Sequence, residues 1–287
     1  MKIGVFGNCQ SVGMADSISA LAPEAEVHCL DVPRARTGTA ETIASEMEIF
    51  SDCDHVFIQP SLSHGIKGLM SEDFAARCKN IIPYPLIACR SLQPDCHYLQ
   101  YDKGGHLEGP LGPYQSGIAA GAYLSGLSLD RATALFSIFT YRKLDYPGFH
   151  LGDEVIGREA RRFEYDLGAF FRGENGFFMH TINHPRIDII FETARQGLHK
   201  AGISCDECAE QPVDLLEQNC IWPHYPGLAK KFAPSGDDIR FRRPRMNTNL
   251  SLSEFVEASY ETFRAADGAF RSDLSDRVRT FIATHVV

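Results

Sequence analysis

Short apolar runs alternate with helical patterns through the first hundred residues of the chain. Residues 3–6 predict a buried strand, and a helix with one apolar face follows, carrying Val12, Ala15, Ile18 and Ala22. The same pattern predicts strands at 27–30, 55–58 and 81–88 and a helix at 39–50. Two prolines restrict the last strand to an edge of the sheet or to a late start. We therefore predict an α/β fold with a doubly wound, flavodoxin-like parallel sheet.

The pattern changes after about residue 110, where helical segments follow one another without regular strands between them. The spacing predicts one long helix with Val155, Ile156, Phe163, Leu167 and Phe170 on its apolar face. A brief strand at 177–180 precedes a helix that begins with Pro185 in its first turn. Two more helices are predicted at 252–263 and 274–282. We expect an α/β sheet region at 1–110 and a mainly helical region at 111–287, packed as one compact unit.

A long irregular segment at 211–247 contains aromatic residues, which indicates packing rather than disorder. Four arginines crowd its end, at Arg240, Arg242, Arg243 and Arg245. Two interpretations stay open for them. They form either a solvated or internally paired loop, or a contact with a phosphate-bearing ligand, for which guanidinium groups have the geometry.

Composition excludes several classes of protein. Of the 287 residues 44% are hydrophobic and 23% charged, and no apolar run is long enough to span a membrane. The first residues resemble a strand rather than a signal peptide, so we expect a cytoplasmic protein. Nine cysteines, an odd number, suit reduced thiols. The net charge of −9 argues against general nucleic-acid binding.

Five residues follow the first predicted strand directly, at the point where the first helix begins: Gly7, Asn8, Cys9, Gln10 and Ser11. A strand-to-helix elbow exposes a side chain at the carboxyl edge of a sheet, beside free backbone N–H groups and the positive end of a helix dipole. The dipole favours a phosphate and lowers the pKa of a thiol. The elbow therefore predicts a thiolate nucleophile, an anion cradle, or both.

A thiol nucleophile needs a base, and His184 is the candidate because it follows a predicted strand and precedes Pro185. The alternative is a histidine that only satisfies local backbone groups. Gln59, at the end of the third predicted strand, is a candidate oxyanion donor. With Cys9 it would complete a catalytic site at the sheet edge.

Further candidates for cofactor or substrate binding are Arg90, Asp95, His97, Arg142, Lys143 and His180. The first three follow the proline-rich strand, where open α/β sheets bind ligands, although Asp95 also suits a turn. Arg142 and Lys143 would suit a phosphate or ribose, or form a solvated pair. No metal is expected, because the residue before Pro185 is biased away from the helix that a pair of ligands at 180 and 184 would need. The spacing of Cys205, Cys208, Cys220 and His224 matches a zinc site only weakly.

Three segments carry a resemblance to the WcbI family of capsular-polysaccharide biosynthesis proteins. They are Gly7-Asn8-Cys9-Gln10, Gln93-Pro94-Asp95-Cys96-His97-Tyr98 and Asn183-His184-Pro185. The elbow also resembles that of the SGNH hydrolases, with cysteine in place of serine. The family resemblance implies binding of coenzyme A, acetyl-coenzyme A or another 3′-phosphorylated adenosine nucleotide. It also implies acyl transfer, most simply acetylation, to a polysaccharide or its sugar precursor.

The sequence therefore predicts an acyltransferase whose partners are an acyl-coenzyme A and a carbohydrate acceptor. Either the Cys9 thiolate accepts the acyl group, or His184 activates the acceptor hydroxyl for direct attack on the thioester. Three alternatives stay open: an esterase or thioesterase using the same pair, a coenzyme A-binding protein without catalysis, and a sulfotransferase. We expect no nucleic-acid partner and no membrane span; the oligomeric state is not predicted.

Overall fold

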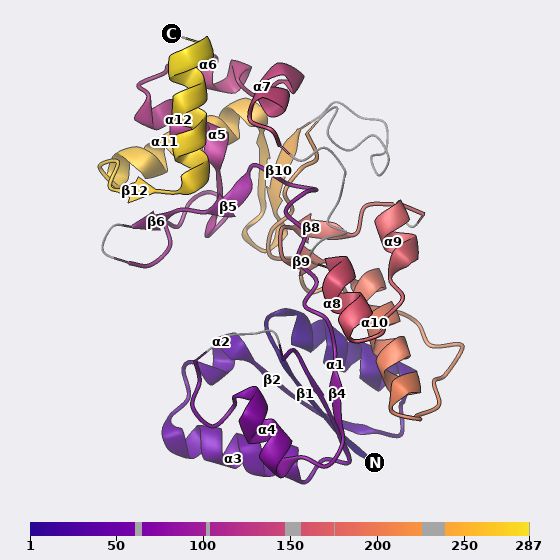
Figure 1. Cartoon of the computed structure of the whole chain (residues 1–287). Helices are drawn as coiled ribbons and strands as arrows, with labels where there is room; N and C mark the ends of the chain where they lie inside the picture. The colour runs from indigo at the N-terminus through magenta and orange to yellow at the C-terminus, as the bar shows by residue number, and fades with distance from the viewer. Residues whose placement is uncertain (61–64, 102–103, 147–155, 175, 226–238, 287) are drawn as a thin grey trace. The chain divides into compact units, whose positions relative to one another are not determined.

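The computed structural model describes residues 1–60, 65–101, 104–146, 156–174, 176–225 and 239–286 (Figure 1). The chain divides into two compact units. Unit 1 consists of Met1–Ala88, Asp153–Glu174 and His184–Leu216, and unit 2 of Cys89–Gly152, Asn175–Asn183 and Glu217–Val287. Each unit contains a hydrophobic core of its own. Both units draw on segments from either side of residue 110.

Unit 1 is built on a four-stranded parallel sheet. Its strands are β1 (Lys2–Gly7), β2 (Glu26–Asp31), β3 (His55–Ile58) and β4 (Ile81–Pro83). They lie in the order β2-β1-β3-β4, and every pair is parallel. This is the order in which the first four strands of a flavodoxin-like sheet are arranged. The predicted α/β fold with a parallel sheet is confirmed.

Strand β4 lies at an edge of the sheet, as its prolines predict. It is shorter than expected, because it ends at Pro83 rather than continuing to residue 88. Proline has no N–H to donate to a neighbouring strand, so pairing cannot extend far on that side. The chain after β4 therefore leaves the sheet, and its residues Tyr84 and Ile87 bond to the end of β1 and the start of α1.

Helices cover both faces of this sheet (Figure 1). The helices of unit 1 are α1 (Gln10–Leu21), α2 (Val32–Ala35), α3 (Ala40–Ser51), α4 (Ser71–Arg77), α8 (Ile156–Arg162), α9 (Gly168–Arg172) and α10 (Ile187–Lys200). On one face the ring of Phe6 contacts Phe50 of α3 and Phe74 of α4. On the other face α10 approaches so closely that a Cβ on Gly197 would lie 2.6 Å from the Phe57 ring. The predicted helix at 39–50 corresponds to α3, which the Thr39 hydroxyl caps.

Two helix predictions for this unit are wrong in detail. The single helix expected around 155–170 is two short helices, α8 and α9, separated where Glu164 takes a left-handed conformation with φ 60°. Val155 lies outside the described residues. Pro185 does not begin a helix; it lies in the short strand β9 (His184–Pro185), and α10 starts at Ile187. The N–H of Ile187 donates to the Asp214 carboxylate, at 2.9 Å, which fixes this later start.

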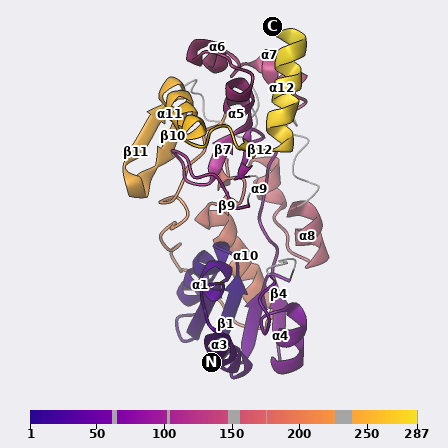
Figure 2. The ribbon, with the colours of Figure 1, turned by 90° about the vertical axis from the view of Figure 1, so that its left-hand side faces the viewer.

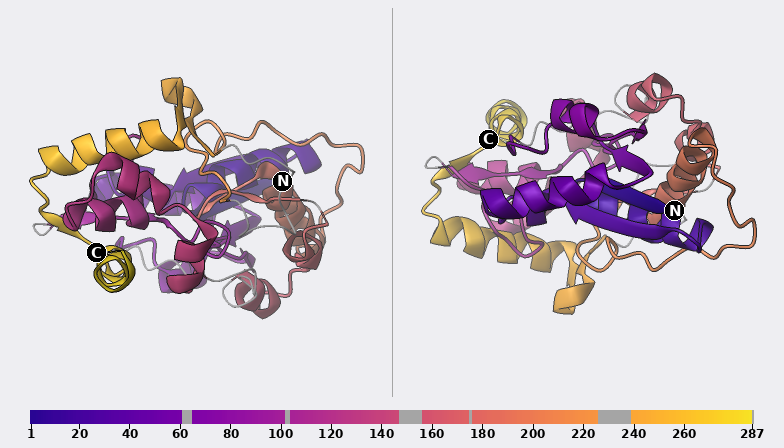
Figure 3. Two further views of the ribbon diagram at one scale, coloured as in Figure 1. Left: turned by 90° about the horizontal axis from the view of Figure 1, so that it is seen from above. Right: turned by 90° about the horizontal axis from the view of Figure 1, so that it is seen from below.

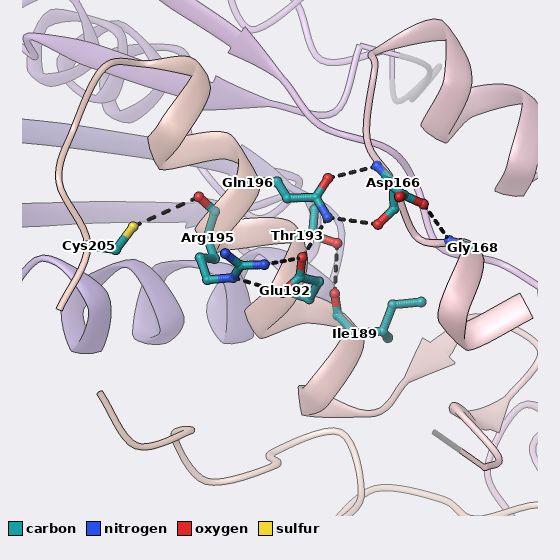
Figure 4. A network of polar contacts seen from close by, with 8 residues as sticks. All are labelled: Asp166, Gly168, Ile189, Glu192, Thr193, Arg195, Gln196 and Cys205. Atoms are coloured by element: carbon teal, nitrogen blue, oxygen red, sulfur yellow. Dashed lines mark hydrogen bonds and ion pairs between the residues drawn. The ribbon is translucent and has the colours of Figure 1, made fainter. Parts of the chain in front are cut away.

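A polar network fastens the loop before α9 to the surface of α10 (Figure 4). The Gln196 side chain accepts from the backbone N–H of Asp166 and donates to its carbonyl, both at 2.8 Å. Gln196 also donates to Glu192, which in turn accepts two hydrogen bonds from Arg195. Glu192, Arg195 and Gln196 lie on one face of α10, so the network holds the loop against that face.

Unit 2 contains short antiparallel strand pairs in addition to the predicted helices (Figure 2). The strands are β5 (Cys96–Tyr98), β6 (Gln100–Tyr101), β7 (Tyr114–Ser116), β8 (Met179–Thr181), β10 (Arg240–Arg243), β11 (Thr248–Ser251) and β12 (Phe270–Arg271). Within unit 2 they pair as β5 with β7, β6 with β12 and β10 with β11. The expectation of helical segments without regular strands between them after about residue 110 is therefore wrong, whereas the brief strand expected at 177–180 corresponds to β8. Strands of two to four residues are too short for an alternating pattern to stand out.

Helix α5 (Gly117–Leu124) runs through the core of unit 2, with α6 (Leu129–Ala134) and α11 (Leu252–Ala265) against it. Helix α12 (Asp273–His285) packs on the glycine face of α5, where a Cβ on Gly121 would lie 2.5 Å from Val278. Helix α7 (Ile138–Lys143) completes the unit. In the part of the chain that the structure describes, no helix combines the length and apolarity needed to cross a membrane.

Candidate active site at the carboxyl edge of the parallel sheet

The predicted elbow is present at the carboxyl end of β1. The strand ends at Gly7 and α1 begins at Gln10, so Cys9 occupies the N-cap position. The side-chain oxygen of Asn8 accepts the N–H of Gln10 at 2.9 Å. Its carbonyl accepts from both the N–H and the hydroxyl of Ser11, at 3.0 and 2.8 Å. Asn8 and Ser11 therefore satisfy the first turn of the helix and fix the direction of Cys9.

Two buried glutamines anchor the elbow from below. Gln59 Oε1 accepts the backbone N–H of Asn8 at 2.9 Å, and its Nε2 donates to Gln10 Oε1 at 3.2 Å. Gln10 in turn donates to the Ile87 carbonyl at 2.7 Å and accepts the Ile87 N–H. Both amides are almost fully buried, and these bonds fix their orientation. The structure accounts for both as positioning residues. The oxyanion role predicted for Gln59 and the place of Gln10 in an anion cradle stay predictions.

Only glycine fits at position 7, where the strand ends and the elbow begins. A Cβ at this position would lie 2.3 Å from the Tyr84 hydroxyl and 2.6 Å from Gln59 Oε1. Tyr84, on the chain after β4, donates to the Phe6 carbonyl at 3.3 Å and so holds the end of β1. Nothing in the sequence marks Tyr84 as part of the site, because a tyrosine that follows a proline carries no signal of burial beneath an elbow.

Burial, rather than the helix dipole, dominates the chemistry of Cys9. The side chain is half-buried, and desolvation raises the pKa of its thiol to about 11, with Asp31 adding to the effect. Asp31 ends β2 directly beside Gly7 in the sheet register. The expected lowering of the thiol pKa by the helix end is therefore wrong. At pH 7 a pKa of about 11 leaves roughly one thiol in ten thousand ionised.

Two hydrogen-bond donors at the elbow have capacity left for a ligand. Among the described residues, neither Asn8 Nδ2 nor the backbone N–H of Cys9 donates to an oxygen. Both belong to the strand-to-helix turn, so a carbonyl oxygen beside the Cys9 sulfur would find donors there. Developing negative charge on that oxygen is what such donors stabilise.

His184 lies at the same end of unit 1 as the elbow. Helices α1 and α10 run side by side in the same direction: a Cβ on Gly13 would lie 3.4 Å from Ile187, near the start of α10. At the other ends of the two helices, the backbone N–H of Asp206, six residues after α10, donates to the carbonyl of Leu21, the last residue of α1, at 2.7 Å. Cys9 precedes α1 and His184 precedes α10 by three residues. The two predicted catalytic residues thus share the carboxyl edge of the sheet, with the His184 side chain 8% exposed.

The side chain of Asp95, in unit 2, is fully buried, and its carboxylate accepts four hydrogen bonds. Its Oδ1 accepts from the Ile118 N–H at 2.8 Å and from the Tyr146 hydroxyl at 2.9 Å. Its Oδ2 accepts from the Ser116 hydroxyl and from Tyr225 at 2.8 Å. Burial and this carboxyl together raise the pKa of both tyrosines well above 10, so both stay neutral donors. These contacts account for Asp95 as the centre of the unit 2 fold.

His97 is likewise buried between structural groups. Its Nδ1 lies 3.2 Å from the Asp95 carbonyl, and its Nε2 lies 2.8 Å from the hydroxyl of Ser272, the N-cap residue of α12. Because a carbonyl only accepts, we assign the proton of the neutral ring to Nδ1. Burial lowers the pKa of His97. Burial also lowers the pKa of His224, on the segment after Trp222, to about 4.

These two histidines predict a loss of stability in mild acid. Below their unfolded pKa of 6.5 the unfolded chain binds protons that the folded unit does not. The free energy of unfolding therefore falls as the pH drops from about 6.5 towards 4. We expect His224 to contribute a loss of about 2 kcal/mol between pH 7 and pH 5, and His97 to add to it, measured by urea unfolding with Trp222 fluorescence. His224→Gln should show a smaller loss; an identical loss in both chains would contradict this assignment.

The remaining predicted residues also belong to unit 2. Arg90, Arg142 and Lys143 are exposed, and the Lys143 ammonium lies 5.9 Å from the centroid of the Phe139 ring. The His180 side chain is buried, and its backbone carbonyl accepts from the Trp222 N–H at 2.7 Å and from the Gln93 side chain at 3.1 Å. Ligand-binding roles for these four residues stay predictions.

The four residues whose spacing weakly matches a zinc site do not all belong to one unit. Cys205 and Cys208 belong to unit 1, and Cys220 and His224 to unit 2. Within the described ranges, no three His, Cys, Asp or Glu side chains form a group that could hold a metal ion. The Cys205 thiol instead donates weakly to the Arg195 carbonyl, at 3.9 Å (Figure 4).

Comparison with known proteins identifies the family. The model of the family described as polysaccharide biosynthesis enzyme WcbI matches residues 2–206, which include the elbow, Gln59 and His184. The chain belongs to the WcbI family. The resemblance noted from three short motifs is thereby confirmed, and with it the assignment to enzymes of polysaccharide biosynthesis.

A solved structure of WcbI has the same fold as this member of the WcbI family. The two share 18% sequence identity with a TM-score of 0.71, over 99% of this chain and 95% of that one. That structure is described as a novel polysaccharide biosynthesis enzyme, in a native form without a disulfide bond between coenzyme A and one of its cysteines. No curated protein matches the chain.

Proposed function

We propose that this chain binds coenzyme A and transfers an acyl group from it to a hydroxyl of a polysaccharide or its sugar precursor. The observation that carries the proposal is the half-buried Cys9 at the elbow, flanked by two N–H groups that can donate to a ligand oxygen. The solved WcbI structure, described as a native protein without a disulfide bond between coenzyme A and a cysteine, supports coenzyme A as the ligand. Membership of a polysaccharide biosynthesis family supports a carbohydrate acceptor.

The direct route of transfer uses His184 as the base. The imidazole takes the proton of the acceptor hydroxyl while the hydroxyl oxygen forms a bond to the thioester carbon. The Cys9 N–H and Asn8 Nδ2 stabilise the oxyanion that develops on the carbonyl oxygen. The carbon–sulfur bond then breaks, and the thiolate of coenzyme A leaves with the proton from the imidazolium. The product is an ester, and no other reactant is consumed.

The covalent route would pass the acyl group through Cys9. His184 would first take the Cys9 proton as the sulfur attacks the thioester, releasing coenzyme A, and the acceptor hydroxyl would then displace the cysteine. The raised pKa of Cys9 disfavours this route twice. Little thiolate is present, and a thiolate of pKa about 11 leaves more slowly than one of ordinary pKa, about 8.5. We therefore propose the direct route, in which Cys9 contributes its backbone N–H.

Acceptor dependence tests the proposal. The purified full chain is titrated with coenzyme A by calorimetry, then mixed with acetyl-coenzyme A in the presence and absence of a panel of monosaccharides, nucleotide sugars and oligosaccharides. We expect coenzyme A to bind, and thiol release to accompany a gain of one acetyl group by a saccharide. Rapid thiol release without any acceptor would instead indicate a thioesterase. Binding without turnover on any member of the panel would indicate a non-catalytic protein, and no binding would contradict the proposal outright.

A further inference from the structure

The arginine-rich segment forms a hairpin in unit 2, outside the residues that the family model matches. Strands β10 and β11 pair antiparallel, joined by a short 3-10 turn at Pro244–Met246, and continue into α11 (Figures 2 and 3). One face is packed on the core: the buried ring of Phe241 stacks on Phe255 with 3.8 Å between centroids, and the cross-strand partner Leu250 packs beside it. The opposite face therefore points away from the core.

Arginines and neutral polar residues share that outer face. Arg240 lies opposite Ser251, and Arg242 lies opposite Asn249, in the register of the two strands. Residues directly opposite each other project on the same side of an antiparallel pair. Arg242, Asn249 and Arg245 of the turn are exposed, and the Arg245 backbone is fixed by a 2.9 Å hydrogen bond to the Gln218 carbonyl.

The four arginines differ in their carboxylate neighbours among the described residues. Arg240 lowers the pKa of Glu254, so these two charges lie near each other. Arg243 lies against Gly112, next to Glu108. Arg242 and Arg245 form no ion pair with any residue in the described ranges. These two positive charges are three residues apart in the chain and both side chains are exposed, so a bound anion would stabilise the hairpin that carries them.

We propose that the outer face of this hairpin binds the anionic groups of an acidic saccharide. Arg242 and Arg245 contact its carboxylate, phosphate or sulfate oxygens, for which the planar guanidinium is matched, and Asn249 contacts neighbouring sugar hydroxyls. The inference rests on the proposed function, because a polysaccharide acceptor is what places anionic groups beside sugar hydroxyls. Of the two interpretations of the arginine-rich segment, the proposal favours contact with an anionic ligand over a solvated or internally paired loop. The acceptor would then be an acidic saccharide.

Binding of dextran sulfate to the full chain tests the charge contribution. Labelled dextran sulfate is titrated at low salt against the parent chain, R242Q/R245Q and the control R264Q/R279Q, which removes two exposed arginines from α11 and α12. We expect the hairpin variant to bind about 10- to 100-fold more weakly and the control less than about threefold. Equal weakening by both variants would show general attraction to cations and overturn the proposal.

A second comparison separates a saccharide from other polyanions. Asn249→Ala should weaken dextran sulfate binding about 3- to 10-fold while leaving the affinity for inorganic polyphosphate and polyglutamate unchanged. Neutral dextran should not bind. Equal affinity of the parent chain for all three polyanions, or no binding of dextran sulfate, would overturn the proposal. Coenzyme A affinity is measured on the same variants: its absence in every chain would contradict the proposed function, whereas intact coenzyme A binding without a hairpin effect contradicts only this inference.

Discussion

Replacement of His184 by alanine is expected to lower acyl transfer by about 10²- to 10⁴-fold, the range over which a positioned general base accelerates proton transfer. Either route of transfer requires a base at the carboxyl edge of the sheet. Coenzyme A affinity should change less than about threefold, because the imidazole acts on the acceptor proton and not on the cofactor. Steady-state turnover with acetyl-coenzyme A and calorimetry with coenzyme A measure the two quantities separately.

His184 is buried, so its variants need a check on folding. The sole tryptophan, Trp222, lies in unit 2 and does not report on unit 1. Thermal unfolding by far-ultraviolet circular dichroism is therefore the control, together with His184→Gln, which keeps a polar side chain of similar size. Both variants should fold and both should lose turnover. Full activity in a folded His184→Ala chain would contradict the assignment of the base.

Cys9 variants then distinguish the two routes within that prediction. Under the direct route Cys9→Ala keeps turnover within about tenfold, because the backbone N–H at position 9 remains. Under the covalent route the same change abolishes turnover without loss of coenzyme A affinity. Cys9→Ser is the conservative partner, since it keeps a small polar side chain at the helix N-cap.

The central elements of unit 1 were predictable from sequence because each one is strongly patterned. A buried parallel strand is a continuous apolar run, and the turn after β1 combines glycine, asparagine and serine in the positions that a helix start requires. The edge position of β4 is one of the two alternatives that its prolines allow. In each case a local physical rule determines the structure without help from distant residues.

What sequence reasoning missed depends on contacts between distant segments. Nothing local shows that Gln59 turns its amide towards Asn8 and Gln10, or that Ile87 comes back beneath α1. The raised pKa of Cys9 has the same origin, because it reflects how much protein surrounds the thiol. The helix start at Ile187 was misplaced because its cap comes from Asp214, 27 residues away. The sequence thus indicates which residue types meet at the site, whereas burial decides what each can do.

Asp95 gives the largest stability effect that we expect. Replacement by asparagine should lower the free energy of unfolding of unit 2 by about 3–5 kcal/mol, the cost of leaving buried polar groups unpaired. The asparagine amide has one acceptor oxygen in place of two, so the hydroxyls of Ser116 and Tyr225 would face an NH₂ group that also donates. Urea unfolding monitored by Trp222, which is buried in the same unit, measures the change.

Two further variants identify the cause of that loss. Tyr146→Phe removes one donor and leaves the carboxyl with three, so it should cost about 1–2 kcal/mol. Glu261→Gln, an exposed carboxylate on α11, neutralises a charge of the same sign outside the network and should cost less than about 0.5 kcal/mol. If Asp95→Asn were as mild as Glu261→Gln, the four hydrogen bonds would not stabilise the fold, and Asp95 would return to the ligand-binding candidates. A ligand-binding role alone predicts an unchanged unfolding curve, since a carboxyl held for a ligand contributes little to the stability of the unit without it.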